Sequence, residues 1–212
     1  MPGAPNRPPE TTPAPPPVVP VAEPPERRVL RRLAPSRVAL LLDLWKGAPS
    51  PELTGPFEKA EAAFAAGDFP GALNQLDLLS VRFAEPRWPS LPEPFKLLRV
   101  PIPAPMPPHW DPDHALPAPE KEAKRARRAA DEQLALARGT VAWGATHHVD
   151  LADASPGLEE ARAILEAEGV GPGVYERIDR VWEAVRARAP MPKSAPIRAA
   201  APAHPAAEPE EA

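Results

Sequence analysis

Residues 57–83 read FEKAEAAFAAGDFPGALNQLDLLSVRF, and the apolar residues of this stretch recur at the spacing of an α-helix. In its first half, Phe57, Ala60 and Phe64 fall on one helical face. The second half continues the pattern with Phe69, Ala72, Leu73, Leu76, Leu79 and Phe83. Small alanines opposite large phenylalanines allow two helices to approach closely. The stretch therefore predicts two amphipathic helices that pack as a hairpin.

The connection between these two helices is marked by Gly67 and Asp68. Glycine adopts the left-handed conformation that ends a helix without a Cβ clash, so we expect the first helix to end here. Asp68 is a favourable N-cap for the second helix. Pro70 then lies in the first turn, where its missing N–H has no helical partner to lose.

The order of small, large and turn residues in this hairpin resembles one tetratricopeptide repeat, which is a pair of antiparallel helices. The residues that carry the resemblance are Ala60, Ala63, Phe64, Gly67, Asp68, Phe69, Ala72, Leu73 and Leu76. The family places small residues where its helices cross and a Gly-Asp-aromatic turn between them. The resemblance implies a helical hairpin and protein binding. Arrays of such repeats need at least about three units to bury a continuous core, so one unit does not predict a peptide-binding superhelix.

Proline divides the 212-residue chain into segments, because proline fixes φ and removes a backbone donor. Of the 36 prolines, 11 lie in residues 1–25, 12 in residues 86–119 and 6 in residues 190–212. We expect residues 1–25 and 190–212 to be disordered tails. Between them, residues 26–189 are predicted to form one helical domain.

The central proline-rich segment, residues 85–119, carries more large apolar side chains than a disordered linker usually holds. They are Trp88, Leu91, Phe95, Leu97, Leu98, Val100, Ile102, Met106 and Trp110. We therefore predict an ordered, extended strap that lies across the helices and buries these side chains. It separates a first helical part, residues 26–84, from a second, residues 120–189.

The first helical part begins with an arginine-rich helix from Glu26 that Pro35 is expected to interrupt. Ser36 is a suitable N-cap for a second helix that ends at Gly47. The predicted buried side of that second helix comprises Leu40, Leu41, Leu44 and Trp45.

The second helical part begins with a long helix from Glu120, which Gly139 and Gly144 are expected to bend or end near Trp143. Its predicted apolar stripe comprises Ala123, Ala126, Ala130, Leu134, Ala137 and Val141. A hairpin follows, with Asp153 or Ser155 as the first N-cap and the sequence GVGPG (169–173) between its helices. The predicted core of its helices comprises Leu158, Ala161, Ile164, Leu165, Val174, Ile178, Val181, Trp182 and Val185.

The fold class is therefore all-α. It comprises two helical hairpins and an N-terminal helix, joined by the ordered proline-rich segment, with disordered termini.

Two histidine- and aspartate-containing clusters provide ligand types that zinc, manganese and iron accept. One lies in the strap and the other follows the long helix: His109, Asp111, Asp113 and His114, then His147, His148 and Asp150. If the strap folds back, the clusters can share a metal, which makes a metal-binding protein or metal-dependent enzyme one alternative function. The simpler interpretation is that Asp111 and Asp113 form Asx turns and that the histidines cap the helix end or lie in solvent. We favour the simpler one and predict no metal and no cofactor.

Basic residues suggest a second alternative, nucleic-acid binding through arginine-rich helices. Four arginines lie in residues 27–32, and a basic run on the long helix comprises Lys121, Lys124, Arg125, Arg127 and Arg128. Acidic residues are interleaved with both, which favours exposed helices with salt bridges at i and i+4. Because the formal net charge is −4, nucleic acid is not the expected partner.

The remaining features favour a non-enzymatic protein–protein interaction or adaptor module of unknown partner. Cysteine is absent, and no apolar run approaches the length of a membrane span. No signal peptide is recognisable, so we expect a cytoplasmic location. Phosphate-loop, nucleophile-elbow and HExxH motifs are missing from the sequence. We expect a binding site between Phe64, Leu76 and the strap residues Trp88 and Trp110.

Overall fold

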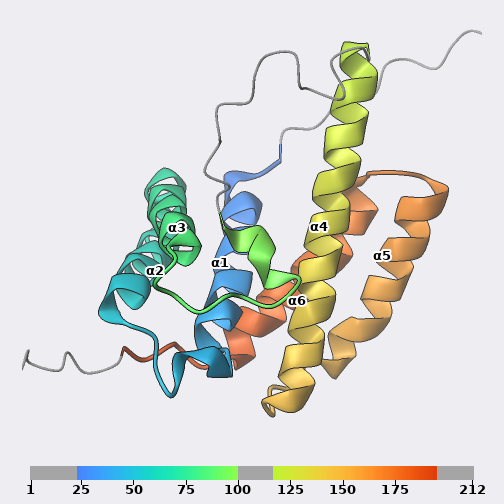
Figure 1. The fold of residues 1–212 in the computed structure, drawn as a ribbon. Coiled ribbons are helices and arrows are strands. Elements are labelled where there is room, and N and C mark those ends of the chain that lie inside the picture. Colours follow the sequence, from blue (N-terminus) through green and yellow to red (C-terminus); the bar gives the residue numbers. More distant parts are fainter. Residues whose placement is uncertain (1–22, 100–116, 195–212) are drawn as a thin grey trace, which may run out of the picture.

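The computed structural model describes residues 23–99 and 117–194, and all regular secondary structure in these ranges is helical. This confirms the predicted all-α fold (Figure 1). The α-helices are α1 (Pro25–Leu41), α2 (Pro51–Ala65), α3 (Phe69–Ala84), α4 (Ala118–Thr146), α5 (Ser155–Ala167) and α6 (Pro172–Arg188). Short 3-10 turns are η1 (Asp43–Trp45), η2 (Phe95–Leu98) and η4 (Ala152–Ala154).

Helix α1 lies at the centre of the molecule, between the α2–α3 hairpin and the layer formed by α4, α5 and α6 (Figure 1). It contacts α2, α3, α4, α6 and η2. Every residue from Leu33 to Leu40 is buried, including Pro35, Ser36 and Arg37. The two hairpins are thus held together through α1.

The α2–α3 hairpin has the turn that the sequence predicts. Gly67 has φ +76°, and the Asp68 carboxylate accepts a hydrogen bond from the Gly71 amide at 2.9 Å. Helix α2 begins at Pro51, earlier than residue 57, so Leu53 also belongs to its buried face. The predicted residues that are fully buried here are Phe57, Ala60, Ala72, Leu76, Leu79 and Phe83.

The predicted break at Pro35 is wrong, because α1 continues through it to Leu41 and Ser36 caps no helix. A proline inside a helix costs about 3 kcal/mol relative to alanine. Burial of this part of α1 against its neighbouring helices offsets that cost. The chain turns later, at Lys46 and Gly47, which have φ values of +48° and +107°.

Helix α4 is expected from the sequence to bend or end near Trp143, and it ends three residues later, at Thr146. A Cβ at Gly139 would lie 2.6 Å from Pro94 Cδ, and one at Gly144 would lie 2.7 Å from the Val149 carbonyl oxygen. The two glycines therefore allow close approach of other segments to α4. Of the predicted stripe, Ala130, Leu134 and Ala137 are buried, Val141 is half-buried, and Ala123 and Ala126 are exposed.

In the α5–α6 hairpin, the predicted N-caps are not used. Ala154 occupies the N-cap position of α5, and no side chain caps the first turn of this helix. Asp153 instead accepts two hydrogen bonds from Arg188 at the end of α6, each at 2.7 Å. The predicted turn is present, with Gly169 at φ +83°. The predicted core residues are buried except Ile164, which is half-buried.

The described part of the strap, residues 85–99, packs against the helices, with Leu91, Phe95 and Leu98 buried. It is not wholly extended, because η2 forms a 3-10 turn in which Leu97 is 42% exposed. The predicted buried residues Val100, Ile102, Met106 and Trp110 lie outside the described residues.

Most of the two predicted tails also lies outside the described residues, as 1–22 and 195–212. Where the second tail is described, residues 190–194 are not detached from the domain. Pro192 is buried, and the Ser194 hydroxyl shares a hydrogen bond with the Thr54 hydroxyl of α2. Among the helices in the described ranges, none is long and apolar enough to cross a membrane.

We expect Gly139→Ala to destabilise the protein by about 1–3 kcal/mol, because the new methyl group would overlap the ring of Pro94. Gly157→Ala is the matched control, since its Cβ would meet Arg177 at an ordinary 3.8 Å. That change should be neutral or stabilising by up to about 1 kcal/mol. Urea unfolding followed by circular dichroism measures both, and equal effects would contradict the close packing of residues 85–99 on α4.

Candidate functional site

The histidine cluster after the long helix forms the C-terminal end of α4. The Nδ1 atom of His147 lies 3.0 Å from the Trp143 carbonyl oxygen and 2.8 Å from the Thr146 hydroxyl, and its ring stacks on Trp143 with centroids 5.0 Å apart. His147 Nε2 lies 3.2 Å from a carboxylate oxygen of Asp43 in η1. These contacts correspond to the helix-capping interpretation of the sequence.

The other two members of this cluster, His148 and Asp150, also have local structural explanations. His148 is exposed with φ +58°, and Asp150 accepts a hydrogen bond from the Ala152 amide at 3.2 Å. In residues 23–99 and 117–194, no three side chains are grouped as metal ligands. The strap candidates His109, Asp111, Asp113 and His114 lie outside these ranges, so a metal site shared between the clusters stays an alternative to the favoured interpretation.

The expected partner site between Phe64, Leu76 and Trp88 does not form one surface. Phe64 is half-buried in the last turn of α2, where Arg186 lies 4.3 Å from its ring centroid, and Leu76 is 1% exposed. Trp88 packs on Trp45, and its neighbour Arg87 pairs with Glu52 at the start of α2. Glu52 and Phe64 are separated by about 18 Å along α2, given its rise per residue, so Trp88 lies at the other end of the hairpin. Trp110 lies outside the described residues.

The arginines of α1 connect it to other helices. Arg31 donates two hydrogen bonds to Asp179 of α6, at 2.7 and 2.9 Å, and Arg32 pairs with Asp77 of α3 at 2.7 Å. The first of these pairs is nearly buried. These side chains are therefore occupied in holding α1 between its neighbours.

A second buried ion pair joins Arg37 of α1 to Glu61 of α2, with 6% and 11% of the two side chains exposed. Arg186 of α6 contacts the same carboxylate at 3.2 Å, and Arg37 also donates to the Arg186 carbonyl oxygen at 3.0 Å. One carboxylate thus pairs with two guanidinium groups where three helices meet.

Glu61→Gln should lower the free energy of unfolding by about 3 kcal/mol, because it leaves two guanidinium groups without a counter-charge. Glu132→Gln is the control: it removes one side of the solvent-exposed Arg128–Glu132 pair and should cost less than about 0.5 kcal/mol. Denaturant midpoints measured at equal slope compare the two. A Glu61→Gln effect as small as the control would show that the buried network contributes little.

The basic run on α4 contains the i, i+4 pairs that its interleaved acidic residues predict. Arg127 pairs with Asp131 at 3.3 Å, and Arg128 pairs with Glu132 at 2.9 Å. The first turns of α4 extend beyond the other helices (Figure 1). Nucleic-acid binding through this surface stays an alternative that the sequence does not favour.

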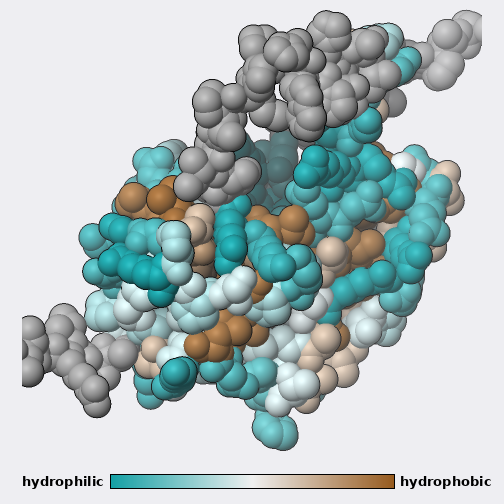
Figure 2. Space-filling model, in the orientation of Figure 1, coloured by the Kyte–Doolittle hydropathy of each residue, from teal (hydrophilic) through white to brown (hydrophobic). Residues whose placement is uncertain are grey.

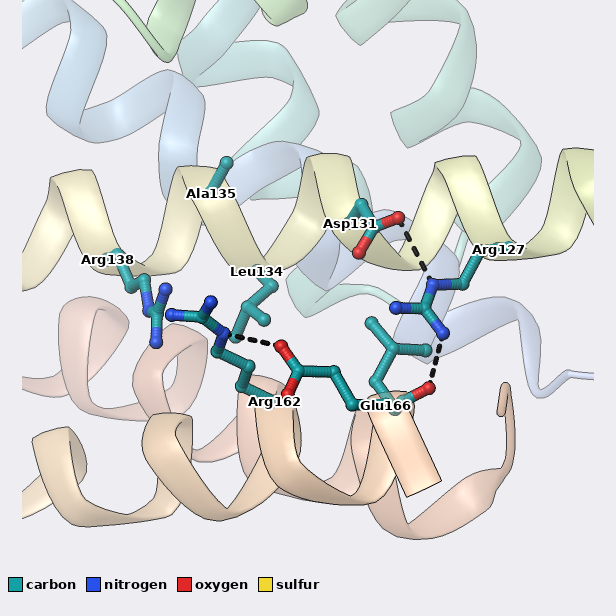
Figure 3. A pocket seen from close by; sticks show the side chains of 8 residues that line it. Arg127, Asp131, Leu134, Ala135, Arg138, Arg162 and Glu166 are labelled. Atoms are coloured by element: carbon teal, nitrogen blue, oxygen red, sulfur yellow. Dashed lines mark hydrogen bonds and ion pairs between the residues drawn. The ribbon is translucent and has the colours of Figure 1, made fainter. Parts of the chain in front are cut away.

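A groove of about 310 Å³ lies between α4 and α5, and three arginines line it (Figure 3). The guanidinium groups of Arg138 and Arg162 point toward one another, while Arg127 lies at the other end. Every one of them has a carboxylate partner: Asp131 for Arg127, Glu159 for Arg138 and Glu166 for Arg162. The hydrogen bond from Arg162 lowers the pKa of Glu166. The arginines of the groove are therefore paired with carboxylates in its wall and beside it.

A second pocket, of about 270 Å³, lies between the two helical parts, and we call it the Arg99 pocket. Its walls come from α1 (Arg31, Arg32, Ser36), α3 (Ser80), η2 and the residue after it (Leu97, Leu98, Arg99) and α4 (Glu132, Gln133, Leu136). The Arg99 guanidinium has no hydrogen bond or ion pair with any described residue, and its Nε is shielded from solvent. The side-chain oxygen of Gln133 is likewise shielded and without a partner.

The outer face of α3 presents two large apolar side chains to solvent, Leu78 and Val81, each 51% exposed. Their spacing of three places them on one face, opposite the buried Leu76, Leu79 and Phe83. Figure 2 shows hydrophobic surface over α3 among hydrophilic neighbours. We call this pair the α3 outer face.

No family model, curated protein or solved structure matches the chain. What the protein binds therefore has to be inferred from its own surfaces.

Sequence reasoning missed the α3 outer face and the Arg99 pocket for different reasons. Leu78 and Val81 are apolar but lie outside the helical stripe of residues 72, 76, 79 and 83. Their position on the opposite face was the sequence signal that could have identified them. Arg99 carries no comparable signal, because its pocket is assembled from four elements that are distant in the chain.

Proposed function

We propose that the protein is a non-enzymatic protein–protein interaction module and that the α3 outer face belongs to its binding surface. The observation that carries the proposal is the paired exposure of Leu78 and Val81 on one helical face. Single apolar residues at a surface are ordinary, whereas grouped ones are typical of interaction sites. The resemblance of residues 57–83 to a tetratricopeptide repeat supports the same function.

The surroundings of the α3 outer face fit the usual organisation of an interface, with apolar residues at its centre and polar residues at its rim. Asp77 lies beside the pair and Arg82 follows it, and each is already in an ion pair. A partner can therefore contact the apolar pair without leaving these charges unpaired.

The α3 outer face is too small to form a stable complex by itself. Burying the exposed half of a leucine and a valine contributes about 1 kcal/mol each at ~25 cal/mol per Å². A stable complex usually buries about 800 Å² on each partner. The α3 outer face would then be the apolar centre of a larger contact that includes neighbouring polar residues.

The double variant Leu78→Glu and Val81→Glu should lose a protein partner, because the partner's apolar surface would have to desolvate two carboxylates. The matched control is Val170→Glu with Met191→Glu, since both residues are exposed apolar side chains outside α3. Affinity capture from native extract with quantitative mass spectrometry compares both variants with the unaltered chain. A captured protein is then purified, and its binding is measured directly.

We expect a partner that binds both the unaltered chain and the control variant directly. The same partner should bind the α3 variant at least about tenfold more weakly. Sedimentation of the purified chain shows whether that partner is a second copy. Direct partners that bind all three proteins equally would contradict a role for the α3 outer face. Retained circular dichroism of the variant excludes unfolding as the cause.

A further inference from the structure

We propose that the Arg99 pocket binds a small monocarboxylate attached to an apolar group. This inference is independent of the proposed function, since the pocket lies on the side of α3 that faces α1, with Ser80 in its wall. The exposed residues Leu78 and Val81 do not line it.

The charges around the pocket leave one positive charge without a counter-charge among the described residues. Arg31 is paired with Asp179 and Glu23, and Arg32 with Asp77. The one acidic side chain in the wall, Glu132, is paired with Arg128. Arg99 alone among the arginines of the wall has no partner in residues 23–99 or 117–194. A ligand with a single negative charge would therefore balance the pocket.

The geometry of a guanidinium group favours a carboxylate as that charge. Arginine presents its Nε and Nη donors in a planar fork that matches the two oxygens of a carboxylate. The Nε of Arg99 is shielded from solvent, so a carboxylate would meet the guanidinium group at its Nη donors, which have no acceptor among the described residues. Gln133 in the same wall can add a second polar contact by donating from its side-chain Nε2.

The apolar part of the wall selects what the carboxylate is attached to. Leu98 and Leu136 are buried, and Leu97 at the rim is 42% exposed, so a hydrocarbon group can cover it. The volume of about 270 Å³ lies just below the usual range for ligand pockets, which fits a small acid. Inorganic phosphate lacks an apolar part and carries charge that one arginine does not balance, so it should bind poorly.

Titration of the full chain with benzoate tests the proposal, with side-chain methyl and amide NMR signals as the readout. We expect saturable shifts of the Leu97, Leu136 and Gln133 signals. Benzamide has the same shape without the charge, and it should bind about tenfold more weakly or not at all. Equal binding of benzamide, or benzoate shifts that do not saturate, would overturn the proposal. So would phosphate displacing benzoate at equal concentration.

Two arginine variants localise the binding. Arg99→Gln should weaken benzoate binding by about tenfold or more, since it removes a charge-assisted hydrogen bond. Arg180→Gln removes an exposed arginine of α6 that does not line the pocket, and it should leave the affinity unchanged. Equal affinities for the two variants would overturn the assignment.

A third variant keeps the test meaningful if Arg99→Gln alters the fold. Leu97→Ala shortens an exposed side chain and retains Arg99, so it should fold and still lose affinity severalfold. Unchanged affinity in Leu97→Ala would contradict the apolar part of the site.

The natural ligand can be a free organic acid or the carboxyl terminus of a peptide, because both present a carboxylate beside an apolar group. Acetyl-glycyl-leucine and its C-terminal amide distinguish them. Tighter binding of this peptide acid than of benzoate assigns the site to a chain end, and the reverse order assigns it to a free acid. Failure of both acids to bind would overturn the proposal, whatever the outcome at the α3 outer face.

Discussion

The pairing of the α1 arginines with carboxylates on three other helices is the interaction on which the rest of the structure depends. Helix α1 is buried along its middle, yet it carries charged side chains there. A buried charge is costly unless it is paired. Asp179 of α6 and Glu61 of α2 meet this requirement for Arg31 and Arg37, and Asp77 of α3 pairs with Arg32 nearer the surface. The same pairs set how the two hairpins lie relative to α1.

This arrangement also determines where ligands and partners can bind. Arginines that hold helices together are not available for nucleic acid or for anions, and the arginines of the α4–α5 groove are paired in the same way. Arg99 differs because it follows η2, which packs over α1 and α4, and within residues 23–99 and 117–194 no carboxylate pairs with that side chain. The α3 outer face differs as well, since α2 covers only one side of α3.

Some of the expected functional residues could be interpreted from the local sequence and others could not, for physical reasons. His147 lies near chain neighbours whose contacts explain it, so the capping interpretation could be made from local sequence. Phe64 and Trp88 lie at opposite ends of one hairpin. The sequence pattern started the first helix at residue 57, whereas α2 begins at Pro51, so the hairpin is longer than expected. Arg99 could not be singled out, because its lack of a partner among the described residues depends on which carboxylates four separate elements bring near it.

The sequence by itself determined the helical class, the α2–α3 turn at Gly67 and Asp68, and the buried residues of α6. These follow from local rules, namely left-handed glycine, side-chain capping and helical periodicity. Tertiary structure alone decided that α1 continues through Pro35 and that Gly139 and Gly144 allow close packing instead of ending a helix. Packing energy gained at these positions exceeds the local cost of proline or glycine, and that gain depends on segments far along the chain.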